Sequence, residues 1–217
     1  MMPKMTFILF SVLTVVMFWL IPALFYSWFP ASMVTHWDFF GQPNGYSSQN
    51  FALFFMPALT TFLLFLFLLL PKIDPYHANF KQFFLYYYRF VAVICFFLFY
   101  LYLLTLIWNL GYSFNFIQFF IPAFGFLFYF VGYLLEHTRP NWFVGIRTPW
   151  TMSNPVVWKR THSLGARLFK SSSLIMFGGL IFPGAGLLFV LIPILTVSLY
   201  LYLYSFWIYS HLKHGNN

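Results

Sequence analysis

The feature that most constrains this chain is a series of apolar runs, each long enough to cross a lipid bilayer. About 20 helical residues, at about 1.5 Å each, cover the roughly 30 Å of hydrocarbon. Runs of this length occupy residues 5–29, 51–70, 89–109 and 118–135, and a longer one occupies residues 171–210. With 62% hydrophobic and 6% charged residues, the sequence lies outside the range of soluble domains. We therefore predict an all-α integral membrane protein held in the lipid bilayer.

The run at residues 171–210 is too long for a single span. The cluster Pro183-Gly184-Ala185-Gly186 interrupts it and favours a turn at that point. We therefore predict that this run folds into a fifth and a sixth transmembrane helix. Five spans, with residues 171–210 only partly inserted, are the alternative.

The positions of Lys and Arg predict the orientation. With six spans, all 11 of them fall on the side that holds both termini. By the positive-inside rule that side is cytoplasmic, and residues 30–50 form an extracytoplasmic loop. The formal charge of +8 is then explained by topology, so we expect no direct binding to nucleic acid. The predicted location is the cell membrane, crossed several times.

The predicted extracytoplasmic loop contains one turn signal and one cluster of polar side chains. Asn44-Gly45 favours a tight turn. His36-Trp37-Asp38 offers two ligands for a metal ion, or a histidine held by a carboxylate. Two ligands are too few for a convincing metal site, so a hydrogen-bonded turn is the expected structure and no metal is predicted.

A polar, basic and turn-rich segment, residues 136–170, separates the fourth and fifth spans. Thr148 precedes Pro149 and is therefore pushed toward extended geometry. Ser153 or Asn154 can cap a helix whose first position is Pro155. We predict a helix that begins there, between spans four and five.

That helix is amphipathic and lies on the cytoplasmic side. Its basic face carries Lys159, Ser163, Arg167 and Lys170 at spacings of four and three residues. Such a face can serve as a platform for a partner or for anionic lipid, or it can simply lie in the headgroup layer and lead into the next span.

The same segment resembles the signature of the SdpI family of bacterial membrane immunity proteins. The resemblance rests on Asn141, Gly145, Ile146, Arg147, Thr148, Pro149, Trp150, Thr151, Val157, Trp158, Thr161, His162 and Gly165. The extracytoplasmic loop resembles a module often found ahead of that region, with a Gln at position 49 where the family often carries a Lys. The residues that match this module are His36, Trp37, Gly41, Pro43, Asn44, Gly45 and Tyr46.

The resemblance implies a two-part chain: a two-span module over residues 1–70 and a four-span SdpI-like region over residues 71–217, with its signature loop at residues 136–170. It implies a protein that protects its cell from a secreted peptide toxin. Some relatives also hold a cytoplasmic transcriptional repressor at the membrane when the peptide is present. The candidate functional residues of the signature loop are Asn141, Gly145, Arg147, Thr148, Pro149, Trp150, Thr151, Trp158, Thr161 and His162. Those of the extracytoplasmic loop are His36, Trp37, Asp38, Gly41, Asn44 and Gly45.

Within the signature, Arg147 is the strongest candidate. A guanidinium on a turn at the interface can form paired hydrogen bonds with a phosphate, a carboxylate or carbonyl groups, and Glu136 is one possible partner. Trp158 and His162 are four residues apart on the predicted helix and can form a cluster with Trp150.

Two other classes of function stay open. One is a membrane enzyme or transporter that acts on lipid or on envelope precursors, and the other is a non-catalytic membrane sensor or scaffold. We find no P-loop, nucleotide fingerprint, zinc-protease motif or serine-nucleophile elbow, so no catalytic residue and no cofactor are predicted. The spans carry no mid-span charge, which argues against an ion pump.

Overall fold

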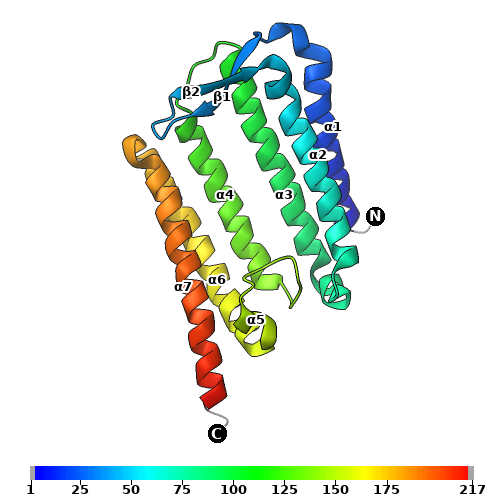
Figure 1. The fold of residues 1–217 in the computed structure, drawn as a ribbon, viewed down its shortest axis with the longest axis vertical. Helices are drawn as coiled ribbons and strands as arrows, with labels where there is room; N and C mark the ends of the chain where they lie inside the picture. Colours follow the sequence, from blue (N-terminus) through cyan, green and yellow to red (C-terminus); the bar gives the residue numbers. More distant parts are fainter. Residues whose placement is uncertain (1–2, 215–217) are drawn as a thin grey trace.

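The computed structural model describes residues 3–214 and is a bundle of long helices with a small β-hairpin at one end (Figure 1). The all-α membrane fold predicted from the sequence is confirmed, apart from two short strands. The elements in chain order are α1 (Pro3–Phe25), β1 (Ser32–Trp37), β2 (Pro43–Ser48), α2 (Gln49–Ile73), α3 (His77–Asn109), α4 (Phe116–His137), α5 (Pro149–Ser153), α6 (Pro155–Met176) and α7 (Gly186–His214). Short 3₁₀ turns follow α1 and α6 and precede α7.

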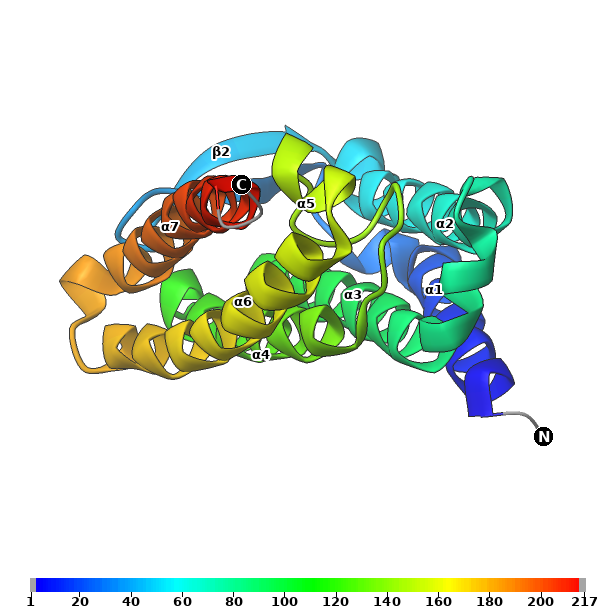
Figure 2. The same ribbon diagram turned by 90° about the horizontal axis from the view of Figure 1, so that it is seen from below.

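The six long helices alternate in direction and form two groups. In one group α1, α2 and α3 pack on one another, and in the other α4, α6 and α7 do so, with α3 against α4 joining the groups (Figure 2). Three clusters of buried apolar side chains fill the interior. They centre on Phe80, Tyr87 and Val91, on Phe18, Leu53 and Tyr102, and on Ile121, Met176 and Val190.

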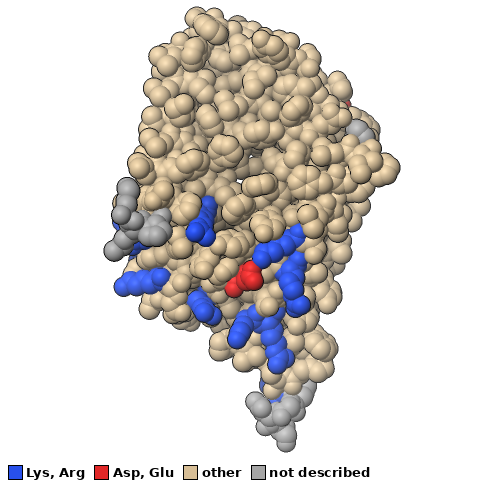
Figure 3. Space-filling view, turned by 180° about the vertical axis from the view of Figure 1, so that it is seen from behind, with Lys and Arg blue, Asp and Glu red and all other residues tan. Residues whose placement is uncertain are grey.

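All 11 Lys and Arg residues lie in the half of the molecule remote from the β-hairpin, which we call the basic end (Figure 3). The opposite half, with β1 and β2, is the hairpin end. The predicted grouping of the charges therefore agrees with the fold. Which end faces the cytoplasm stays a prediction.

The connection between α2 and α3 is much shorter than predicted. The apolar runs at residues 51–70 and 89–109 leave residues 71–88 as the expected connection, but only residues 74–76 are non-helical. The early part of α3 is helical because it has a buried face, on which Phe80 and Phe83 are at most 1% exposed. Phe83 departs from helical geometry (φ −128°, ψ 18°), so this part bends away from the rest of α3.

The predicted amphipathic helix and the predicted fifth span are one helix. Asn154 caps α6 as expected, and its side chain accepts from the amides of Val156 and Val157. However, α6 does not end after the basic face; it continues to Met176 and packs along α4 and α7. The amphipathic helix predicted between spans four and five is therefore present, but it is longer than expected and has no break near residue 171, because basic side chains on one face do not stop a helix.

By length and hydropathy, five helices of the described chain qualify as membrane spans: α1, α2, α3, α4 and α7. The helix α6 does not qualify because it carries four charged residues. Its turn to α7, at residues 177–185, nevertheless lies at the hairpin end, so α6 extends from one end of the molecule toward the other (Figure 1). This turn includes the predicted Pro-Gly break. Six membrane crossings stay a prediction.

The β-hairpin has a different turn from the one predicted. β1 and β2 are antiparallel, and Gly45 lies within β2 opposite His36. The turn instead occupies residues 38–42, where the amide of Asp38 donates to the carbonyl of Gln42. The Asn-Gly pair was misleading because its register places it inside a strand.

Candidate functional site

The centre of the signature is the loop between α4 and α5, residues 138–148, and Asn141 organises it. Asn141 is fully buried. Its Nδ2 donates to the carbonyls of Arg139 and Val144, both at 2.8 Å, and its Oδ1 accepts from the amides of Phe143 and Val144 at 2.9 and 2.6 Å. One amide side chain therefore replaces the backbone pairing that this irregular segment lacks.

The α2–α3 connection braces this loop from outside, through two residues that the sequence reasoning missed. Asp74 is buried, and its Oδ2 accepts from the amide of Trp142 at 2.8 Å while its Oδ1 accepts from that of Tyr76 at 2.6 Å. Asn79 Nδ2 donates to the carbonyl of Pro140 at 2.7 Å. The only available signal was that Asp74 is one of three acidic residues in the chain.

Gly145 brings the loop against α6. Its φ of +123° is a conformation that residues other than glycine rarely adopt. A Cβ at this position would lie 2.4 Å from Nε2 of His162. The glycine is therefore needed both for the backbone conformation and for the close approach to α6.

His162 joins the loop to α6 as a neutral ring. Its Nε2 accepts from the amide of Ile146 at 3.0 Å, so Nδ1 carries the proton and donates to the carbonyl of Trp158 at 2.8 Å. His162 lies in the first half of α6, under the loop. Burial lowers the pKa of His162 to about 4, which keeps the ring neutral at pH 7.

Trp158 and His162 form the cluster predicted from their spacing, but Trp150 is not part of it. The rings of Trp158 and His162 stack with centroids 3.9 Å apart and an interplanar angle of 17°. Trp150 instead packs on α7, 5.1 Å from the ring of Tyr202 and 5.0 Å from that of Phe206.

The Thr-Pro-Trp-Thr part of the signature forms the start of α5. Thr148 is extended (φ −108°, ψ 162°), as expected before Pro149, and it forms a capping box with Thr151. Thr148 Oγ1 also lies 3.0 Å from the hydroxyl of Ser205 on α7. This part of the signature therefore ties the loop to α7. Nearby, Thr161 is buried, and its hydroxyl has no hydrogen-bond partner among the described residues.

Arg147 is exposed, unlike most of the signature. Within residues 3–214 it makes no hydrogen bond and no ion pair. The suggested partnership with Glu136 is wrong, because Glu136 pairs with Lys170 of α6 at 2.5 Å. The loop thus presents a free guanidinium on a rigid frame.

A basic groove lies between α6 and α7, on a different face of α6 from the one that contacts the loop. It is a hollow of about 560 Å³ whose cationic side chains are Lys159, Arg160 and Arg167, with Ser163 and Tyr204 as further polar groups. No acidic residue lines it. The predicted basic face therefore borders a concave surface that suits an anionic partner.

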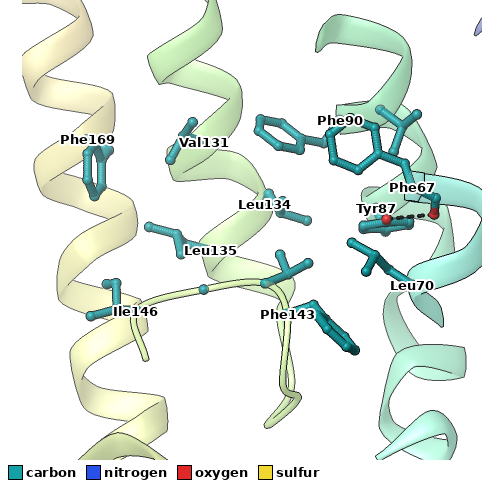
Figure 4. Close-up of a pocket in the computed structure, with 13 residues that line it drawn as sticks. Phe67, Leu70, Tyr87, Phe90, Val131, Leu134, Leu135, Phe143, Ile146 and Phe169 are labelled. Carbon is teal, nitrogen blue, oxygen red and sulfur yellow. Dashed lines mark hydrogen bonds between the residues drawn. The ribbon is translucent and has the colours of Figure 1, made fainter. Parts of the chain in front are cut away.

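An apolar cavity of about 310 Å³ lies behind the loop (Figure 4). Side chains from α2, α3, α4 and α6 point into it, and Phe143 and Ile146 of the loop close its lower side. The hydroxyl of Tyr87 is held by the carbonyl of Phe67 at 2.8 Å. The cavity therefore offers space for an apolar group, or for inward movement of the loop, but no arrangement of reactive groups.

At the hairpin end, the predicted polar residues form hydrogen-bonded structure. Nδ1 of His36 lies 2.5 Å from Oδ1 of Asn44, so the histidine is held by an amide and not by Asp38. Asp38 Oδ1 accepts from the amides of Phe40 and Gln42, both at 2.9 Å. This is the hydrogen-bonded turn that we expected for this cluster.

The remaining hairpin residues attach the hairpin to the helices. Trp37 stacks on Phe116 of α4 at 4.0 Å. Gly41 is buried against Asn115, whose Nδ2 donates to the carbonyl of Phe40 at 2.9 Å. The hairpin is therefore fixed across the first turn of α4.

The described residues contain no group of three or more His, Cys, Asp or Glu side chains that could hold a metal ion. The signature instead divides into two classes. Most of its members are buried and shape the loop. Arg147 and the basic groove remain available for contact. The geometry is that of an exposed cation on a buried, hydrogen-bonded support.

Comparison with protein families agrees with this description. Residues 137–205 match the SdpI/YfhL protein family, and residues 7–61 match a domain of unknown function (DUF1648). The first match includes the α4–α5 loop, α5 and α6, and the second includes the β-hairpin. No curated protein and no solved structure matches the chain. The resemblance seen in the sequence is therefore confirmed: in this multi-pass protein of the bacterial cytoplasmic membrane, residues 137–205 are similar to the SdpI/YfhL family, and they follow a DUF1648 match at residues 7–61.

Proposed function

We propose that this chain protects its cell from a secreted antimicrobial peptide. The family match supports a membrane immunity-type protein in general. The observation that carries the proposal further is the signature loop itself, in which buried residues such as Asn141 and His162 hold a rigid frame and Arg147 stays exposed and unpaired. Such a frame supports recognition more readily than catalysis.

The hairpin end is the surface that we assign to the peptide. It carries exposed aromatic side chains and no Lys or Arg, which suits an apolar peptide that approaches from outside the cell. Phe40, Tyr46 and Tyr112 are between 58% and 68% exposed. Arg147 lies at the other end, so its role is to stabilise the protective state or to contact a partner on that side.

Survival of a peptide-sensitive strain, with and without this protein, tests the proposal. We expect survival to rise on expression. Arg147→Ala should reduce it at unchanged abundance in the membrane, whereas Lys72→Ala, an exposed cation of the same end outside the signature, should not. Full protection by the Arg147 variant would remove Arg147 from the mechanism. If the wild-type chain protects against no peptide, the alternatives of a lipid-acting protein or a sensor gain weight.

The basic groove supports a second proposal, that the chain holds a cytoplasmic transcriptional repressor at the membrane. Lys159, Arg160 and Arg167 form a concave cationic surface without an acidic neighbour, which suits an acidic protein surface. The test is recruitment of a fluorescent repressor to the membrane in the presence of peptide. Replacing all three with Gln should abolish recruitment and leave survival unchanged; recruitment by that variant would exclude the groove.

A further inference from the structure

The membrane-facing surface has a furrow lined by α1, α3 and α4. It consists of two hollows, of about 660 and 310 Å³, which share lining residues and are therefore continuous. Most of the lining is apolar. It includes Phe7, Phe10, Val93, Phe96, Phe126 and Leu127. The furrow therefore offers an extended apolar surface on which a hydrocarbon chain can lie.

One charged side chain, Arg89 of α3, lines this furrow. Its Nη1 donates to the hydroxyl of Tyr133 at 2.8 Å, and its guanidinium carbon lies 5.3 Å from the centre of the Phe7 ring. A guanidinium has five N–H donors, and Tyr133 accepts only one of these bonds. An arginine among membrane-facing apolar groups is costly unless an anion reaches it.

No side chain of this protein supplies that anion. The chain has three acidic residues, and each is engaged elsewhere. Asp38 accepts backbone amides in the hairpin turn, and Asp74 accepts amides beside it and in the α4–α5 loop. Glu136 pairs with Lys170. Among the described residues no acidic side chain pairs with Arg89, so an anion from outside the chain can pair with it.

The depth and length of the furrow fit one leaflet of a bilayer. Arg89 contacts Phe7 and Tyr133, each about one turn from the basic end of α1 or α4, so it lies near the depth at which these helices leave the membrane. The stretch of α3 from Arg89 to Tyr100 rises about 17 Å, close to half of the roughly 30 Å of hydrocarbon.

From this arrangement we propose that the furrow binds one anionic phospholipid from the leaflet at the basic end. The phosphate group accepts the free N–H groups of Arg89, since guanidinium and phosphate match in geometry. An acyl chain lies over Val93 and Phe96 and continues toward Tyr100. The site is separate from the signature loop, so it can exist whether or not the proposed immunity function is correct.

Native mass spectrometry of the full chain in detergent tests this site, with phosphatidylglycerol and phosphatidylcholine of identical acyl chains as probes. We expect phosphatidylglycerol to bind about tenfold more tightly. Arg89→Gln should remove most of that preference. Lys81→Gln, which removes an exposed cation of the same helix outside the furrow, should leave it intact.

Equal binding of the two lipids would overturn the proposal, and so would an equal loss of preference in both variants. Displacement of phosphatidylglycerol by millimolar inorganic phosphate would also overturn it, because it would indicate a site for free anions. A second measurement covers the case in which Arg89→Gln fails to fold. Phosphatidylglycerol with a photoreactive acyl chain should crosslink to Phe96 or Phe126 of the wild-type chain, and crosslinks confined to other helices would contradict the assignment.

Discussion

At both ends of the molecule, polar side chains form hydrogen bonds with backbone groups that lie outside regular structure, but the two ends differ in charge. At the hairpin end, Asn109 pairs with both the amide and the carbonyl of Val34, and Asn115 holds the turn. At the basic end, Asn141 and Asp74 brace the α4–α5 loop. Amide or carboxylate side chains satisfy irregular backbone at both ends, and those at the basic end are buried whereas those at the hairpin end are partly exposed. The Lys and Arg residues lie only at the basic end, so we expect anions to be recognised there and apolar groups to be recognised at the hairpin end.

The largest expected effect comes from the residue that organises the basic-end loop. Asn141→Ala leaves several buried backbone groups without partners and should lower the free energy of unfolding by about 3–4 kcal/mol. Asn115→Ala, its counterpart at the hairpin end, removes fewer bonds and should cost about half as much. Thermal unfolding in detergent measures both. Equal losses would mean that the two ends are braced to the same degree.

Gly145→Ala should cost about 2–3 kcal/mol, because both the positive φ and the contact with His162 oppose a Cβ. Gly111 separates these two causes. It also has a positive φ, +98°, but a Cβ added there would meet no atom within 4 Å. Gly111→Ala therefore measures the backbone cost alone, and the difference between the two variants measures the fit of the loop against α6. No difference would show that the contact with α6 is loose.

Acidic pH should weaken the basic end specifically. The pKa of His162 is about 4 in the folded protein and about 6.5 when unfolded, so the unfolded chain binds the extra proton first. Stability is full above about pH 6.5 and falls toward pH 4, by on the order of 2 kcal/mol. His162→Gln should flatten the dependence of melting temperature on pH between about 7.5 and 5. His36→Ala, at the hairpin end, should preserve it.

The smallest expected effect on stability is that of Arg147→Ala, within about 0.5 kcal/mol, because the side chain is exposed and unpaired. Melting temperature and survival should therefore separate: the variant keeps the fold and loses protection. A large loss of stability would reveal a structural partner and assign Arg147 to the frame instead of the contact surface.

Local features of this chain could be predicted from its sequence, and distant pairings could not. The cap at Asn154, the extended Thr148 before Pro149 and the stacking of Trp158 on His162 all follow from residues within four positions of one another. Asp74 accepts a hydrogen bond from the amide of Trp142, which is 68 residues away, and no local sequence pattern predicts this pairing. The hairpin turn was misplaced for the same reason, since register depends on what each strand faces.

The continuity of α6 has a mechanical consequence. From its Asn154 cap to Met176 it is one uninterrupted helix about 33 Å long, and it joins the loop and groove of the basic end to the turn at the hairpin end. A rod of this length that tilts by about 5° displaces one end by about 3 Å relative to the other. On the proposed model, a peptide bound at the hairpin end and a partner bound at the basic end would therefore both act on α6.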